Sequence, residues 1–363
     1  MNSIILSPVG TSIFTKGKFP SEINQFSNYK NLEDIPSDRR GIISSYIQEV
    51  HDLMLSSSLE DVKKRSAELN GIIHYYNDNL HNAQKDIHYL LPSDTYIGKS
   101  ACEIIKCFLD KYIGSVCVLE IKDLQTYDCD RFQYALSDVV SQIMIIKRGL
   151  LPEQKFIFNL TGGFKSILCF LQSLGMFYAD ETVYVFEYSK DLMRIPALPV
   201  KLVPYDYLKE YIVVFRRLYN NLSVAEEEYD KIPESLILKL YGEPTLSAYG
   251  KIVWDNFRKD LYSEKLLDSI SPKVKYSEIF LKSTKDLGKD RYYNLNMRID
   301  EVSCFMELKS KPNPASLDLK KLATPKGIST HEFDAWADKD AKRVFCHYDQ
   351  DILVLDTLLE GLH

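Results

Sequence analysis

Residues 159–166 carry the side chains and backbone freedom that a phosphate-rich ligand requires. They read Asn-Leu-Thr-Gly-Gly-Phe-Lys-Ser and follow the apolar run 156–158, which predicts a strand, a tight turn and a helix. The glycines allow positive φ angles and let a ligand approach the backbone. The helix that begins near Lys165 points unpaired N–H groups and a positive dipole end at that ligand. The pattern predicts a nucleotide-like ligand; the alternative is an ordinary strand-to-helix turn with an exposed lysine.

A second loop of this kind follows the apolar run 4–6. Residues 7–12 read Ser-Pro-Val-Gly-Thr-Ser. In an open parallel sheet, ligands bind beyond the carboxyl ends of the strands, where the winding reverses. If the two strands are near neighbours, both loops line one crevice. The candidate ligand-binding residues are Gly10, Thr11, Ser12, Thr161, Gly162, Gly163, Phe164, Lys165 and Ser166.

The elements that must position these loops alternate between strand and helix over residues 1–204. This alternation predicts an α/β domain with a Rossmann-like, doubly wound parallel sheet. Strands are expected at 3–7, 87–91, 115–121, 155–160, 182–187 and 193–196. Helices are expected at 38–65, 98–113, 130–148 and 164–177.

Two further segments follow the α/β domain. Residues 205–270 show only helical spacing, at 207–218, 233–240 and 249–261, which predicts a helical connector or a small winged-helix-like unit. Residues 271–363 predict a small α+β domain with an antiparallel sheet. Its expected elements are a strand or helix start at 274–280, a helix at 289–306, and strands at 331–336, 343–348 and 352–359.

Composition narrows the class of protein. The 363 residues are 45% apolar, enough for a sizeable core, and carry a formal net charge of −6, which argues against nonspecific nucleic-acid binding. No apolar run is long enough to span a membrane, and the N-terminus lacks a secretory pattern. The cysteines form no C-x-x-C pair, so we expect reduced thiols, no zinc or other metal site and a cytoplasmic location. They are Cys102, Cys107, Cys117, Cys129, Cys169, Cys304 and Cys346.

Residues 1–204 resemble the CARF family, the CRISPR-associated Rossmann-like sensors of cyclic oligoadenylates. The resemblance lies in residues 7–12 after the first strand and in 161–165 after a later one, about 150 residues apart. It implies that both loops bind a cyclic oligoadenylate, with the tetramer as the expected activator. A two-fold symmetric ring further implies a homodimer that holds one ligand between two equal patches.

Residues 271–363 resemble the mRNA-cleaving branch of the RelE/ParE toxin superfamily. The matching pattern is a helix pair, then Arg343-Val344-Phe345, a turn at 349–351, an apolar strand and Gly361. The resemblance implies that Arg343 binds the scissile phosphate and that His363 is a general acid or base. RelE-like toxins often carry lysines on the preceding strand, where this chain has His331, Glu332 and Asp334. Further catalytic candidates are Glu332 and Asp334 as the base, and Lys339 and Lys342 as RNA contacts.

Together the two halves are similar to CRISPR-associated mRNA interferases of antiviral defence. The resemblance implies a ribosome-dependent endoribonuclease, activated allosterically by cyclic tetra-adenylate and independent of metal ions. Residues 271–363 contain 15 Lys or Arg and 15 Asp or Glu, so this module has little long-range attraction for free RNA. The count favours an enzyme that meets its mRNA on the ribosome. We expect no membrane or DNA partner, because no apolar run spans a membrane and no basic recognition helix stands out.

Other functions remain open from the residues alone. Arg343 could be a structural ion pair, and Glu332 and Asp334 a solvated strand face. The chain could be a sensor without nuclease activity, with a ParE-like protein-binding module. It could also be a ring nuclease that degrades its activator with Ser12 and Lys165. A transcription regulator would need a basic recognition helix in 205–270, for which the segment offers little support.

Overall fold

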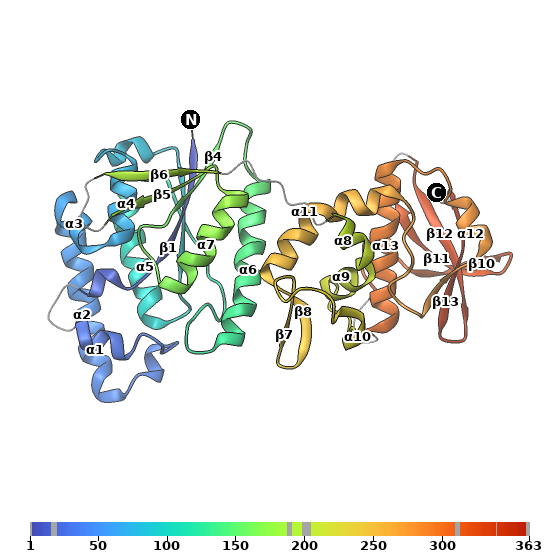
Figure 1. Cartoon of the computed structure of the whole chain (residues 1–363), viewed down its shortest axis with the longest axis horizontal. Helices are drawn as coiled ribbons and strands as arrows, with labels where there is room; N and C mark the ends of the chain where they lie inside the picture. Colours follow the sequence, from blue (N-terminus) through green and yellow to red (C-terminus); the bar gives the residue numbers. More distant parts are fainter. Residues whose placement is uncertain are drawn as a thin grey trace. The chain divides into compact units, whose positions relative to one another are not determined.

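The computed structural model shown in Figure 1 describes residues 2–15, 20–186, 191–197, 205–308, 313–338 and 340–360. Contacts between residues divide the chain into two compact units, Met1–Lys201 and Leu202–His363, called unit 1 and unit 2 below. The expected connector 205–270 and the expected module 271–363 both fall within unit 2.

Unit 1 contains a six-stranded sheet in the order β3-β2-β1-β4-β5-β6. Its strands are β1 (Ser3–Val9), β2 (Ile87–Pro92), β3 (Ser115–Val118), β4 (Lys155–Asn159), β5 (Glu181–Val185) and β6 (Leu192–Pro196). The first five are parallel, whereas β6 runs antiparallel to β5. The chain order reverses between β1 and β4, which lie side by side with Ile4 opposite Phe156. A mixed α/β unit with a mostly parallel sheet is therefore confirmed.

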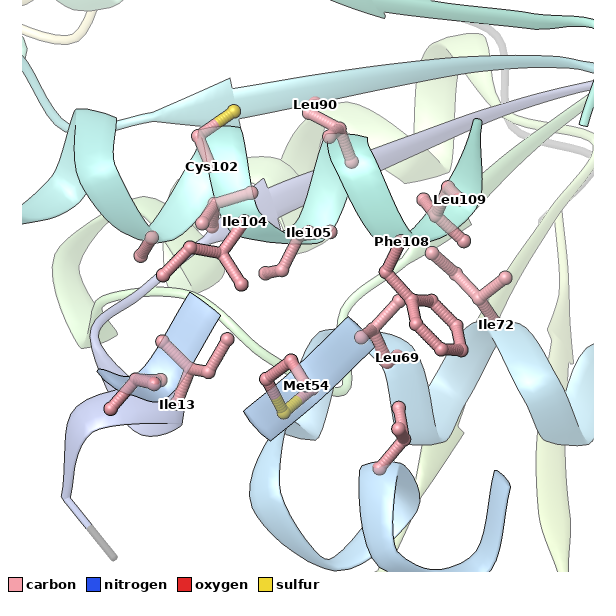
Figure 2. Close-up of a cluster of buried hydrophobic side chains, with 14 of the residues drawn as sticks. Ile13, Met54, Leu69, Ile72, Leu90, Cys102, Ile104, Ile105, Phe108 and Leu109 are labelled. Atoms are coloured by element: carbon pink, nitrogen blue, oxygen red, sulfur yellow. The ribbon is translucent and has the colours of Figure 1, made fainter. Parts of the chain in front are cut away.

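Helices cover both faces of this sheet. They are α1 (Pro20–Gln25), α2 (Ser37–Ser56), α3 (Leu59–Arg65), α4 (Ala67–Tyr75), α5 (Tyr96–Leu109), α6 (Cys129–Arg148) and α7 (Lys165–Tyr178), with 3-10 turns at Ser12–Phe14, Leu32–Asp34 and Leu80–Ala83. Figure 2 shows α5 packing its apolar side, including Ile105 and Phe108, against Leu69 of α4 and Met54 of α2. On the opposite face, α7 approaches β4 near Phe158.

Two expectations for unit 1 are wrong in detail. The single helix expected at 38–65 is interrupted, because Ser58 caps a new helix, α3, by accepting a hydrogen bond from Asp61 N–H. Helix α4 was not expected at all, and Ser66 caps it in the same way through Leu69 N–H. Ser58 was thus interpreted as a residue within a helix, although it caps the start of α3.

The first part of unit 2 is mainly helical, with a small hairpin. Its elements are α8 (Tyr205–Glu210), α9 (Ile212–Tyr219), α10 (Glu226–Tyr229), β7 (Ile237–Leu240), β8 (Glu243–Leu246) and α11 (Ala248–Glu264). The helix expected at 233–240 and the absence of any sheet here are therefore wrong. Tyr241 and Gly242 both have positive φ, the backbone form of a two-residue hairpin turn.

The second part of unit 2 contains a five-stranded sheet in the order β10-β11-β12-β13-β9. Its elements are β9 (Val274–Tyr276), α12 (Glu278–Ser283), α13 (Lys289–Glu307), β10 (Lys320–Lys326), β11 (Ser329–Trp336), β12 (Lys342–Asp349) and β13 (Ile352–Glu360). Strands β10 to β13 form an antiparallel meander, as expected for the last three, and β9 adds in parallel to β13. The basic stretch that includes Lys320 was not expected to form a strand.

Helix α13 takes part in two hydrophobic cores. Leu295, Ile299 and Val302 pack with the five-stranded sheet. Tyr293 and Met297 pack instead against the core formed by α9, α11 and the hairpin. The two parts of unit 2 therefore share one helix.

Candidate functional site

The two glycine-containing loops meet at the carboxyl edge of β1 and β4. A Cβ atom added to Gly10 would lie 3.0 Å from the backbone carbon of Gly163. Gly163 has a φ of +119°, a conformation that side-chain-bearing residues rarely adopt. The glycines at these two positions thus let the backbones of the two loops touch, as the sequence predicts for neighbouring strands.

The buried carboxylate of Glu68, on α4, contacts both loops. Its Oε1 accepts the Gly10 N–H at 2.9 Å, and its Oε2 accepts the hydroxyls of Ser12 at 2.9 Å and Ser66 at 2.8 Å. A Cβ on Gly162 would lie 2.4 Å from Glu68 Cδ, so the second loop also packs on this side chain. The Gly10 N–H and the Ser12 hydroxyl are therefore already paired, and the ligand-binding roles expected of them remain predictions.

Helix α4 is held close to the end of β4 by a second set of polar contacts. The Asn159 side chain donates to Ser7 Oγ and to the Glu68 carbonyl, both at 3.1 Å. Thr161 Oγ1 accepts the Val185 N–H at 3.2 Å, which ties the loop to the end of β5. The loops are consequently anchored to β1, β5 and α4.

A large groove opens beside these loops, with a volume of about 1090 Å³. Of the expected ligand-binding residues, Ser12 and Thr161 line it. Its basic lining residues are Lys63, Lys64, Arg65, His74 and Arg194, and its acidic ones are Glu60, Asp78 and Asp191. Lys63 pairs with Glu60 and Asp78, and Arg194 pairs with Glu181 at 2.6 Å. Two cations of the groove, Lys63 and Arg194, thus have carboxylates as their present partners.

The other expected residues lie around the start of α7 or in the first loop. Phe164 precedes α7 and packs its ring 6.2 Å from that of Phe132, while Lys165 and Ser166 are exposed in the first turn. Thr11 precedes the 3-10 turn Ser12–Phe14 and accepts the Phe14 N–H through its carbonyl. No role follows for these four residues from their contacts alone.

Sequence reasoning missed Glu68 and the basic run 63–65. The run was included in a helix, yet three consecutive cations directly before the Ser66 cap could have marked the end of that helix and a basic rim. Glu68 gives no comparable sign, because its partner Gly10 lies 58 positions earlier in the chain.

In unit 2, the structure brings together three of the expected catalytic residues. Arg343 on β12 lies opposite Asp334 on β11, and its guanidinium is 3.0 Å from Asp334 Oδ1, 3.2 Å from Glu332 Oε1 and 2.8 Å from Asp318 Oδ2. Hydrogen bonds from Arg343 and Lys320 hold the pKa of Asp318 below its ordinary value. Arg343 is therefore enclosed by three carboxylates, which is the arrangement of a structural ion pair.

The remaining catalytic candidates are not joined to this cluster. Lys342 begins β12 and pairs in register with Glu360. Lys339 and His363, as well as Gly361, lie outside the described residues. Within the described ranges, no group of three His, Cys, Asp or Glu side chains could hold a metal ion, and no helix is long and apolar enough to cross a membrane.

Comparison with known protein families gives a match within unit 1. Residues 63–198 match the model of a family described as CRISPR-associated protein (Cas_APE2256). The matched segment runs from the end of α3 to just beyond β6, and it includes Glu68, the basic residues of the groove and the 161–166 loop. A search of curated proteins finds no match. Over residues 63–198, the chain is thus similar to a family of CRISPR-associated proteins.

Proposed function

We propose that this protein is a CRISPR-associated sensor of a cyclic oligoadenylate and that its second unit cleaves mRNA on the ribosome. The observation that carries the proposal is the basic groove at the carboxyl edge of β1 and β4. It lies where open α/β sheets bind ligands, and most of its lining belongs to the segment that is similar to CRISPR-associated proteins.

The groove suits a nucleotide in size and chemistry. Its volume of about 1090 Å³ lies just above the range of typical ligand pockets, as a ligand of several nucleotides requires. Lys63 and Arg194 can exchange their carboxylate partners for phosphates, and Lys64 and Arg65 add two further cations to the lining. Tyr184 offers a ring on which adenine can stack. A cyclic tetra-adenylate is two-fold symmetric, so a homodimer would present two such grooves to one ring.

Unit 2 supplies the proposed effector. Helices followed by an antiparallel meander form the arrangement expected for a RelE-type ribonuclease. The equal numbers of acidic and basic residues in 271–363 favour a substrate that the ribosome already holds. Cleavage by attack of a 2′-hydroxyl on the adjacent phosphate requires a base and charge stabilisation, for which metal ions are not needed.

A binding titration tests the sensor. Purified protein should bind cyclic tetra-adenylate, and Lys63→Ala combined with Lys64→Ala should weaken binding, because each charge-assisted contact contributes about 1.5–3 kcal/mol. Lys165→Ala tests separately whether the start of α7 reaches the ligand. Lys85→Ala is the matched control, since Lys85 is exposed just before β2, at the amino edge of the sheet. Wild-type affinity in the double variant would remove the groove from the proposal.

A translation assay tests the effector. Activator added to a translating extract should produce cuts within ribosome-bound mRNA, whereas naked RNA should be cut slowly. Equal rates on free and translated transcripts would contradict ribosome dependence.

A second candidate function is favoured by the enclosure of Arg343 in three carboxylates. Because a phosphate would have to displace at least one of them, unit 2 could instead be a protein-binding module controlled by the same sensor. Ligand binding without mRNA cleavage in the translation assay would support this candidate.

A further inference from the structure

Unit 2 contains a histidine–aspartate pair that is separate from the Arg343 cluster. His347 Nδ1 on β12 lies 2.8 Å from Asp356 Oδ1 and 3.0 Å from Asp356 Oδ2 on β13. The His347 side chain is 25% exposed, whereas that of Asp356 is 6% exposed. A buried carboxylate therefore holds an imidazole that reaches the surface.

The hydrogen bond fixes which ring nitrogen is available for chemistry. An ionised carboxylate can only accept, so Nδ1 carries the proton and Nε2 of the neutral ring is an acceptor. Within the described part of the chain, His347 makes its hydrogen bonds and its ion pair through Nδ1. This is the arrangement in which a carboxylate orients an imidazole to take a proton through its second nitrogen.

A β-bulge in β13 determines the position of Asp356. Phe345 pairs with Thr357 and Cys346 with Leu355, so Asp356 is an extra residue between two paired positions. Such bulges redirect a side chain and are frequent beside active sites. Ser329 Oγ donates to Asp356 Oδ2 at 2.7 Å, and Ser277 Oγ donates to its carbonyl at 2.8 Å. Ser329 thus holds the carboxylate of Asp356, and Ser277 holds its backbone.

The surroundings of His347 provide a cation other than Arg343. Val344 and Cys346 face the core, so Arg343, Phe345 and His347 share the opposite face of β12. Four residues of strand span about 13 Å, too far for Arg343 and His347 to hold one phosphate. Lys326, which is exposed, lies with its Nζ 4.2 Å from the centre of the Phe345 ring, between those two positions.

We propose that His347 is the general base of RNA cleavage, that Asp356 positions it, and that Lys326 stabilises the phosphate charge. This inference rests on the ribonuclease function proposed above. Nε2 of His347 takes the proton of a ribose 2′-hydroxyl, and the 2′-oxygen forms a bond to the adjacent phosphorus. The bond from phosphorus to the 5′-oxygen breaks, and that oxygen takes a proton from water. The products are a 2′,3′-cyclic phosphate and a 5′-hydroxyl end.

The test uses full-length protein, cyclic tetra-adenylate and ribosomes stalled on a defined mRNA. His347→Gln should lower kcat by about 100-fold or more, the contribution typical of a general base. Asp356→Asn should lower kcat while KM stays near wild type, because the amide no longer fixes the tautomer. Imidazole added to His347→Ala should restore part of the rate, which a purely structural role would not allow.

The matched control is His331→Gln, on the neighbouring strand. His331 packs edge-on against Tyr348, with ring centres 4.9 Å apart, and pairs in register with the core residue Cys346, so the control should keep the wild-type rate. An active wild-type protein with an equally active His347→Gln variant would overturn the role of the pair and leave the proposed function standing. A wild-type protein that cuts no mRNA would overturn the proposed function, and the role of the pair with it.

Discussion

Each unit buries a carboxylate, and the two are stabilised in different ways. Glu68 in unit 1 is 0% exposed and accepts hydrogen bonds from one backbone N–H and two hydroxyls. Asp300 in unit 2 is 3% exposed and meets the buried guanidinium of Arg216, with Nη2 at 2.5 Å from Oδ1, and the hydroxyl of Tyr262. Neutral donors fix the loops around Glu68, whereas a full ion pair joins α9 to α13 around Asp300.

The difference shows what each carboxylate organises. The partners of Glu68 belong to the candidate ligand site, so any movement of the first loop changes the hydrogen bonding of a buried charge. Arg216 also donates to the Asp268 carbonyl at 2.7 Å, so the Asp300 cluster connects packed segments of unit 2. Glu68 is thus suited to respond to a bound ligand, whereas Asp300 is suited to stabilise the core of unit 2.

Arg216→Ala should have the largest effect. Breaking a buried ion pair from one side leaves Asp300 uncompensated and should lower the free energy of unfolding by about 3–5 kcal/mol. Both tryptophans, Trp254 and Trp336, lie in unit 2, so urea unfolding followed by tryptophan fluorescence measures this unit selectively. The double variant Arg216→Met, Asp300→Leu should recover most of the loss. A single variant as stable as wild type would show that the pair contributes little.

Glu68→Gln should cost less, because neutral partners remain. The amide NH₂ that replaces one carboxylate oxygen would face the hydrogen-bond donors around position 68. One buried donor would then have no acceptor, at a cost of about 1–3 kcal/mol. The loss should appear in hydrogen exchange of the first loop and α4, while tryptophan fluorescence of unit 2 stays unchanged. Protection of Gly10 and Leu69 amides equal to that in wild type would contradict this account.

Gly162→Ala tests the same carboxylate by steric means. The added Cβ would lie 2.4 Å from Glu68 Cδ, and such overpacking typically costs about 1–3 kcal/mol. Gly41→Ala is the matched control, since it has nothing within 4 Å and should stabilise α2 by about 0.5–1 kcal/mol. Thermal melts of both variants by circular dichroism measure the contrast, and equal melting temperatures would refute it.

His88, a buried side chain of unit 1, should have a smaller effect on the free energy of unfolding, and that effect depends on pH. Burial lowers the pKa of His88 from its ordinary 6.5 to about 3. Below pH 6.5 the unfolded chain binds a proton at His88 and the folded chain does not. The contribution of His88 to the free energy of unfolding is therefore fully present above that pH and is lost as the pH drops toward 3. Between pH 7.5 and 5.5 the loss should be about 1.5 kcal/mol.

The matched variant for this effect is His88→Gln. It should remove the pH dependence over the same range, as measured by denaturant unfolding of unit 1. If the free energy of unfolding changed with pH equally in the wild type and the variant, other groups would be responsible for the effect.

Local patterns made part of this structure predictable. The strands around β1 and β4 and the glycine turn at Gly163 depend on residues adjacent in sequence, and they were expected at the right places. The partners of Glu68 and Arg343 depend on long-range packing, since Asp318 lies 25 positions from Arg343. The His347–Asp356 pair depends on a bulge that shifts the register of β13, which no local periodicity encodes.

Helix α13 contributes side chains to both hydrophobic cores of unit 2, and this affects how the unit unfolds on heating. Because residues of this one helix complete both hydrophobic cores, neither core can lose the helix without exposing apolar surface of the other. Residues 205–270 should consequently not survive as a folded fragment once the sheet is lost. Calorimetry should record a single cooperative heat-absorption peak for the whole of this unit.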